Sequence, residues 1–297
     1  MENYSESYYS GKTSNNSSPE TVIIINCILN APLMLISIIG NTMVLAAILR
    51  TPSLRSLSTI LLCALAVSDL LVGLVVQPVY ISAKFTRNSS LLKALYVMVT
   101  SACGGSVLIM TLISVDRFLA LNYHMRYPNL MTAYRAIYTS VFLWFVSFLV
   151  SLISFWKMGA YYFLAAVGIL VCLLVSAACY IRIYCIVRKH ELQIHVQQQA
   201  VKCMHTNFNR SMLRSVKCAK NTFIFYIMMI LCYTPWFISA FLSAIFPSQW
   251  IYALVLADTA AFLNSSINLF LYCWRLRELR AAVVRTAKLM LCKKAQV

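Results

Sequence analysis

The sequence predicts an all-α membrane protein, a seven-transmembrane helix bundle followed by a short amphipathic helix. Of its 297 residues 61% are hydrophobic and only 11% are charged, with a mean hydropathy of +0.77. A hydrocarbon core about 30 Å thick requires roughly 20 apolar residues per helix. This composition excludes an ordinary water-soluble domain or a nucleic-acid-binding chain. The long apolar runs cover residues 22–49, 58–82, 90–121, 133–156, 160–187, 218–246 and 250–273.

The runs divide the chain into three parts. Residues 1–21 are rich in Ser and Asn and are predicted to form an extracellular, glycosylated N-terminus. Residues 22–273 form the bundle, and residues 274–297 form a cytoplasmic amphipathic helix with a short tail. The fourth and fifth runs need a turn between them, because one helix over both would be roughly 80 Å long. Lys157-Met158-Gly159 is the segment that fits this turn.

The basic residues predict how the chain crosses the membrane. With seven spans, 20 of the 25 lysines and arginines fall on one side, and cytoplasmic loops carry such an excess. The net charge of +17 is then a signal of topology and of contact with anionic lipid in the bilayer. The sequence therefore predicts a multi-pass plasma-membrane protein with its N-terminus outside. Glycosylation sequons lie on the same outer side, at Asn3, Asn15, Asn16 and Asn88.

The cytoplasmic side has two further predicted features. The strongly basic segment 188–220 contains no proline, so we expect it to extend the fifth and sixth helices beyond the membrane. The tail from 275 to 291 has an amphipathic pattern suited to the inner leaflet. Cys292 follows this pattern and is a candidate for palmitoylation, whereas most of the eleven cysteines fall within spans and are expected to be packing residues.

Polar residues fall midway along several spans, where the membrane makes them costly. Among these mid-span polar residues, Asp69 is the one whose side chain can ionise. Carboxylate, hydroxyl and amide oxygens together suit a small monovalent cation such as Na⁺, or a shared proton. The alternative is a set of interhelical hydrogen bonds, worth about 0.6 kcal/mol each on average. The predicted sodium site comprises Asp69, Ser106, Asn264 and Asn268, with Asn41 nearby.

Short motifs on separate spans, in order, give the chain a family likeness. It resembles rhodopsin-like (class A) G-protein-coupled receptors over nearly its whole length. Three departures from the usual class A pattern make the chain similar to the melanocortin, lysophospholipid and cannabinoid receptor cluster. Leu92 lies near the usual position of the disulfide cysteine in the third span, Cys172 lies near that of the proline in the fifth span, and the second outer loop is almost absent. The matching motifs are Gly40-Asn41, Leu65-Ala66-Val67-Ser68-Asp69, Asp116-Arg117-Phe118, Trp144, Tyr180 with Ile183, Cys232-Tyr233-Thr234-Pro235 and Asn264 to Tyr272.

The resemblance implies a G-protein switch at the cytoplasmic end. In such receptors Arg117, paired with Asp116, is freed when the sixth span swings outward, and Tyr180 and Tyr272 stabilise the open state. Pro235 kinks the sixth helix and, with Tyr233, transmits the ligand signal. Ser215 stands where many members carry an acid that locks the resting arginine, so we expect raised basal signalling.

The same resemblance places a ligand pocket in the outer half of the bundle. Val99 stands where amine receptors use an aspartate, which disfavours a biogenic amine bound in that standard way. Phe262 stands where opsins place the lysine that binds retinal, which disfavours a retinal photoreceptor. A buried carboxylate needs a partner, so we expected Asp258 to meet Lys157, Lys93 or a cationic group on a small, largely apolar extracellular ligand. The predicted ligand residues are Met98, Val99, Phe237, Phe241, Asp258 and Phe262.

The predicted partners are the bilayer, an extracellular ligand and a heterotrimeric G protein. Arrestin binding is expected to be weak, because Thr286 is the only hydroxyl of the tail that a kinase can modify. A non-signalling decoy receptor and a seven-helix transporter or ion pump that uses Asp69 remain as alternatives. An enzyme is not expected, since the spans contain no histidine, no paired carboxylates and no metal-ligand spacing.

Overall fold

The structure is a computed structural model that describes residues 18–54, 56–86, 89–123, 126–200, 206–246, 251–275 and 277–294. In this part of the chain every regular element is a helix, so the all-α prediction is confirmed. The long elements are α2 (Ser18–Arg50), α3 (Leu57–Leu71), α4 (Gln77–Thr86), α5 (Ser89–Asn122), α7 (Ala133–Leu152), α8 (Met158–Ala200), α9 (Thr206–Ile245), α10 (Ile251–Arg275) and α11 (Arg277–Lys294).

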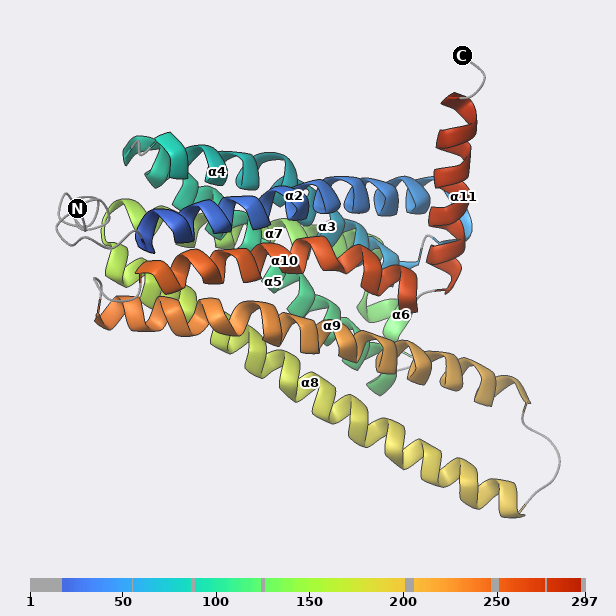
Figure 1. The fold of residues 1–297 in the computed structure, drawn as a ribbon. Helices are drawn as coiled ribbons and strands as arrows, with labels where there is room; N and C mark the ends of the chain where they lie inside the picture. Colours follow the sequence, from blue (N-terminus) through green and yellow to red (C-terminus); the bar gives the residue numbers. More distant parts are fainter. Residues whose placement is uncertain are drawn as a thin grey trace.

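The helices form one elongated bundle (Figure 1). Within the described residues, six segments are long and apolar enough to cross a membrane: Ile23–Arg50, Thr59–Lys84, Ala94–Asn122, Ala133–Phe155, Gly159–Lys189 and Tyr226–Ser243. The seventh helix, α10, lies between α2 and α9 and packs against both. Short elements complete the path, namely the 3₁₀ turns Pro52–Leu54 and Ile153–Phe155 and the single-turn helix α6 (Tyr127–Leu130).

The second span is not the single regular helix that the sequence predicted. A π-helical turn, Val72–Val76, separates α3 from α4. Pro78 follows it, and a proline inside a helix removes one backbone hydrogen bond and crowds the preceding turn. The wider π turn, Val72–Val76, lies just before Pro78, where the backbone hydrogen bond is missing. It lies close to α2, since a Cβ added to Gly73 would be 3.0 Å from Ile38 Cγ1.

The break between the fourth and fifth spans lies slightly earlier than predicted. α7 ends in the 3₁₀ turn Ile153–Phe155, and α8 already begins at Met158, so the break falls at Trp156 and Lys157. The predicted extension of the fifth and sixth helices is present, because α8 and α9 reach beyond the other helices (Figure 1). Pro235 lies inside α9, which continues through it.

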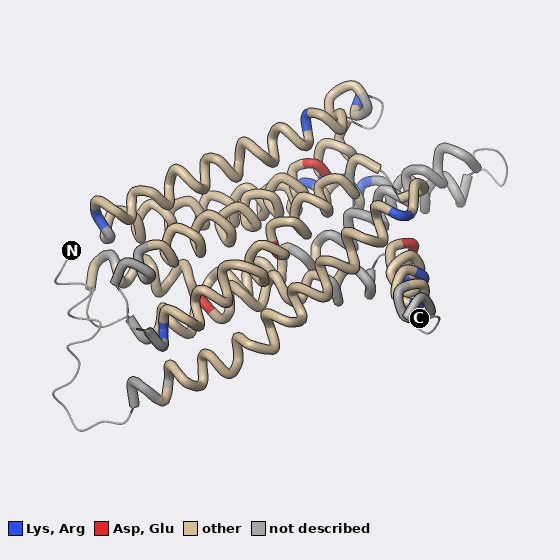
Figure 2. The backbone as a smooth tube through the Cα atoms, turned by 90° about the horizontal axis from the view of Figure 1, so that it is seen from above, with Lys and Arg blue, Asp and Glu red and all other residues tan. Residues whose placement is uncertain are grey.

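Close packing fixes the third span against the fourth. Gly105 lies under Trp144, where an added Cβ would be 2.9 Å from Trp144 Cε2 and Nε1. The same indole nitrogen donates to Ser68 Oγ at 3.1 Å, which joins α3, α5 and α7 at one level. Charge is kept away from this interior: Lys and Arg lie mainly toward the helix ends, while the middle of the bundle contains few charged residues (Figure 2).

The last helix crosses the end of the bundle rather than continuing α10. α11 packs against α2 near its C-terminal end (Figure 1), and its Leu279 and Ala282 are buried there. Thr286 is also buried on this helix, at 3% exposure. α11 contains Cys292, but the side chain of Cys292 lies outside the described residues.

Candidate functional site

The centre of the site is Asp69 on α3, which is fully buried. Its Oδ1 accepts hydrogen bonds from Ser106 Oγ at 3.1 Å and Ser265 Oγ at 2.8 Å, and its Oδ2 accepts one from Asn268 Nδ2 at 2.7 Å. Three spans therefore meet at one carboxylate. Asn41 joins a fourth span, because its Nδ2 donates to the Ser265 carbonyl oxygen at 3.1 Å.

The predicted sodium site is only partly assembled as expected. Ser106 and Asn268 contact Asp69, but the side-chain amide of Asn264 points elsewhere, donating to Tyr233 Oη at 3.4 Å and approaching Met110 Sδ at 3.6 Å. Ser37, which the sequence analysis did not single out, donates to the Asp69 carbonyl oxygen at 2.9 Å. Asparagines on neighbouring helix turns can face different partners, and the sequence gives no measure of each helix's rotation.

Three buried amide oxygens on α2 and α10, two of the helices in this network, have no hydrogen-bond partner within the described residues. They are the Oδ1 atoms of Asn41, Asn264 and Asn268, all buried. Buried acceptors normally have a partner, which is often an ordered water or an ion. Together with the Asp69 carboxylate they form a set of oxygen donors, the ligand type that hard monovalent cations prefer. The residues present therefore fit a small cation with water.

The end of the bundle that contains Arg117, here called the Arg117 end, has a buried ion pair. Arg117 Nη2 lies 2.7 Å from Asp116 Oδ2, and their side chains are 11% and 0% exposed. Tyr127 on α6 donates to the second oxygen, Asp116 Oδ1, at 2.6 Å. The predicted pair is therefore present, and Tyr127 is an additional partner that the motif alone did not indicate.

Tyr180 lies at the same end in an aromatic cluster with α9. Its ring stacks on Tyr226 with 5.1 Å between centroids and also meets the Phe223 ring edge-on. Tyr180 is buried beside Leu121 and Ile183. The side chains of two other predicted switch positions, Tyr272 and Ser215, lie outside the described residues.

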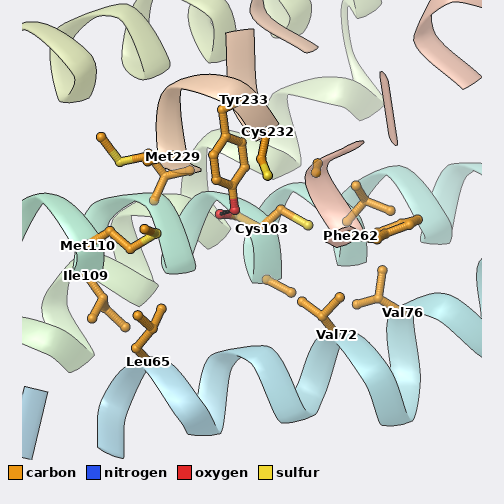
Figure 3. Packing of buried hydrophobic residues seen from close by; sticks show 14 of the residues in the cluster. Leu65, Val72, Val76, Cys103, Ile109, Met110, Met229, Cys232, Tyr233 and Phe262 are labelled. Atoms are coloured by element: carbon orange, nitrogen blue, oxygen red, sulfur yellow. Dashed lines mark hydrogen bonds between the residues drawn. The ribbon is translucent and has the colours of Figure 1, made fainter. Parts of the chain in front are cut away.

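Tyr233 connects the Asp69 layer to the rest of α9. Its ring points from α9 toward α5 beside Cys103 (Figure 3), and its hydroxyl donates to the Cys103 carbonyl oxygen at 3.4 Å. The same hydroxyl accepts from Asn264 Nδ2. Tyr233 is 2% exposed, so both polar contacts are made in the interior. The predicted transmission residue thus joins three spans.

At the opposite end, called the Asp258 end, the carboxylate of Asp258 has a different partner from those expected. Trp236 Nε1 donates to Asp258 Oδ1 at 3.1 Å. Lys84, rather than Lys157, lines the same small cavity, which has a volume of about 30 Å³. The side chain of Lys93, the other expected partner, lies outside the described residues. Lys84 Nζ also lies 5.0 Å from the centre of the Tyr80 ring. Trp236 and Lys84 were both missed because their roles depend on which spans are neighbours.

The predicted ligand residues do not gather in one place. Val99 lines this small cavity. Phe262 is fully buried and meets Tyr80 edge-on at 5.2 Å, so it is a packing residue. Phe237 and Phe241 stack on each other at 6.3 Å between centroids. Neither of the two cavities described in the structure is lined by Met98, Phe237, Phe241 or Phe262.

Comparison with known proteins agrees with this geometry. Residues 40–161 match the model of the family "7 transmembrane receptor (rhodopsin family)". The Histamine H2 receptor of Cavia porcellus is 35% identical over 126 residues, covering 41% of this chain and 35% of that receptor. The Histamine H2 receptor of Canis lupus familiaris is 34% identical over 141 residues, covering 46% and 39% of the two chains. Octopamine receptor 1 of Lymnaea stagnalis is 30% identical over 132 residues, covering 43% and 20%.

The aligned stretch thus spans well under half the length of these relatives. Residues 40–161, which match the family model, contain the motifs of the second, third and fourth spans, including Asp69, Arg117 and Trp144. All three relatives are receptors, in agreement with the prediction that the chain is not an enzyme. The narrower likeness to melanocortin, lysophospholipid and cannabinoid receptors is not tested by these matches. The chain is similar to the rhodopsin-family seven-transmembrane receptors over residues 40–161, and over these residues the resemblance predicted from its motifs is confirmed.

Proposed function

We propose that the chain is a plasma-membrane receptor that activates a heterotrimeric G protein, with its N-terminus outside and the Arg117 end in the cytoplasm. The observation that supports this most directly is the buried Asp116–Arg117 pair beside the extended α8 and α9 helices. An arginine here is costly unless paired, and breaking such a pair strongly destabilises the state that contained it. The ion pair is therefore suited to a switch between two states.

A path of polar contacts supports transmission from the Asp258 end to the Asp69 network in the middle of the bundle. Asp258 accepts from Trp236, one turn from Tyr233, and Tyr233 accepts from Asn264 next to the Asp69 network. All of these side chains are wholly or mostly buried. A change at the Asp258 end would alter contacts of α9 on both sides of Pro235, where the helix lacks one backbone hydrogen bond.

A transporter or ion pump is the alternative from another class. A relay would need further ionisable groups at successive depths. Within the described residues, Asp69 is the ionisable residue buried midway through the bundle, and its donors are hydroxyls and amides. A decoy receptor without signalling fits two departures from the family's motifs, since Tyr233 stands where such receptors usually have tryptophan and Leu269 where they usually have proline. The experiments below separate these three functions.

We expect wild-type protein to show basal second-messenger output that Arg117→Ala abolishes, since Arg117 would contact the G protein once freed from Asp116. The measurement is cAMP, calcium and Rho output in cells with equal surface expression. Arg50→Ala is the control, because Arg50 is an exposed basic residue of the last turn of α2 at the same end. Output indistinguishable from that of empty cells, in both forms, would contradict raised basal signalling and favour a decoy or a transporter.

We expect sodium to raise the melting temperature of the wild type but not that of Asp69→Asn. The carboxylate supplies the negative charge that a cation would need among the unpartnered amide oxygens. Melting curves of purified protein in NaCl and in N-methylglucamine chloride measure this. Asp258→Asn, which removes the carboxylate at the Asp258 end, should keep the sodium response. An equal response of wild type and Asp69→Asn would rule out Asp69 as the site of sodium binding.

We propose that the ligand is largely apolar with one positive group, which Asp258 would receive in place of the aspartate that amine receptors have at Val99. Aromatic side chains surround the carboxylate, with Tyr80, Tyr96 and Tyr162 in the cavity wall. A panel of amines, including histamine and octopamine, should yield agonists whose potency falls about tenfold or more in Asp258→Asn. Agonists that act equally on both forms would show that Asp258 does not bind the cation.

We propose that arrestin capture through the tail is weak. Thr286 is the hydroxyl that a kinase would modify, and it is 3% exposed in the packing of α11 against the bundle. Thr286→Ala should therefore leave agonist-stimulated arrestin recruitment unchanged in a proximity assay. A strong signal that disappears in Thr286→Ala, at equal surface expression, would contradict this proposal.

A further inference from the structure

A second cavity, with a volume of about 160 Å³, lies among α5, α7, α8, α9 and α10. Its inner wall is formed by Cys103, Tyr233 and Trp236. Its outer wall is formed by α7 and α8, with Val146 and Val150 facing Leu164 and Gly168. The small cavity at Asp258 shares Val99 and Trp236 with it, but Asp258 and Lys84 do not line the larger one.

The polar groups in the wall of this cavity already have partners. Thr100 donates to the Tyr96 carbonyl oxygen at 2.9 Å and shares a second hydrogen bond with the Tyr161 hydroxyl. Ser147 donates to the Thr100 carbonyl oxygen at 3.0 Å, and Tyr233 to that of Cys103. A buried water needs two to four polar partners, and apolar cavities stay dry. The wall therefore favours an apolar occupant over water or a polar ligand.

The outer wall faces lipid. Leu164 is 41% exposed, and a Cβ added to Gly168 would meet nothing within 4 Å, so the bundle is open there. Gly168 lies roughly 15 Å along α8 from Met158 at 1.5 Å per residue, which is about half the thickness of the hydrocarbon core. In a bilayer the atoms outside this opening are lipid acyl chains. Hydrocarbon thus has direct access to the cavity from the side.

We propose that this cavity binds an acyl chain of a bilayer lipid, which enters between α7 and α8 and reaches Cys103 and Tyr233. The volume is similar to that of an engineered apolar cavity of about 150 Å³ that takes up benzene. The lipid site is separate from the cation site at Asp258, and its occupancy does not depend on G-protein coupling.

The test uses the full chain in nanodiscs of phosphatidylcholine that has a photoreactive diazirine midway along one acyl chain. After irradiation, mass spectrometry locates the labelled residues. We expect labels on the inner wall near Cys103 and Tyr233 as well as at the opening. Gly168→Leu should reduce the inner-wall label about tenfold, because its side chain displaces about two methylene groups of the lipid chain.

Gly159→Leu is the matched control, since Gly159 also lies in α8 in open space but does not line the cavity. It should leave the inner-wall label unchanged. Val150→Phe narrows the opening from α7 and should give the same loss as Gly168→Leu. Melting curves verify that each variant is folded, and both variants at the opening are used so that one misfolded protein does not decide the result.

Two results would overturn the proposal. In the first, the extent of labelling on the inner wall is no higher than on the buried residues around Asp69, or it is equal in the wild type and in both variants at the opening. The other is labelling by a small free apolar diazirine but not by the phospholipid probe, which would assign the cavity to a membrane-dissolved molecule instead. Both are independent of second-messenger output, so failure here and failure of the proposed receptor function are distinguishable.

Discussion

The burial of the Asp69 carboxylate is the constraint on which the arrangement of the spans depends. A carboxylate removed from water is strongly destabilising unless donors surround it. The donors come from α5 and α10, and the Ser265 carbonyl oxygen then accepts from Asn41 on α2. Rotating any of these helices would leave a polar group unpaired in a medium with no water to replace the bond. One acid thereby sets the mutual rotation of four spans.

α9 contacts both ends of the bundle, because its polar and aromatic side chains bond to different layers. Trp236 bonds to Asp258, whereas Tyr233 bonds to Cys103 and Asn264. Pro235 lies between them, at the point where the helix lacks one backbone hydrogen bond. At the Arg117 end, the same helix meets Tyr180 through Tyr226 and Phe223. A rigid-body movement of α9 would therefore change all three sets of contacts together.

The sequence predicts the spans well because the membrane imposes a length and an apolar composition on each of them. It also identifies Asp69 and the Asp116–Arg117 pair, since ionisable residues inside spans are rare. The π turn at Val72–Val76 was missed, because it depends on how Pro78 and the approach of α2 are accommodated together. The sequence did not predict that Asn264 bonds to Tyr233, and it did not identify Trp236 and Tyr127, for a shared reason. Hydrogen-bond partners between helices depend on helix rotation, which apolar runs without a polar face do not specify.

The distribution of polar atoms also explains why the bundle has two cavities of different character. At the Asp258 end, mostly aromatic side chains surround a carboxylate and an ammonium group, so that cavity suits a charged group. Toward α7 and α8, Ser147 and Thr100 bond to backbone carbonyl oxygens, so the wall of that cavity is mostly apolar. Because Val99 and Trp236 belong to both walls, an occupant that moves either side chain changes the shape of the other cavity. Coupling of this kind is reciprocal. If a bound lipid chain changes the affinity of the Asp258 site for a cation, a cation bound at Asp258 changes the affinity of the larger cavity for the lipid chain by the same factor.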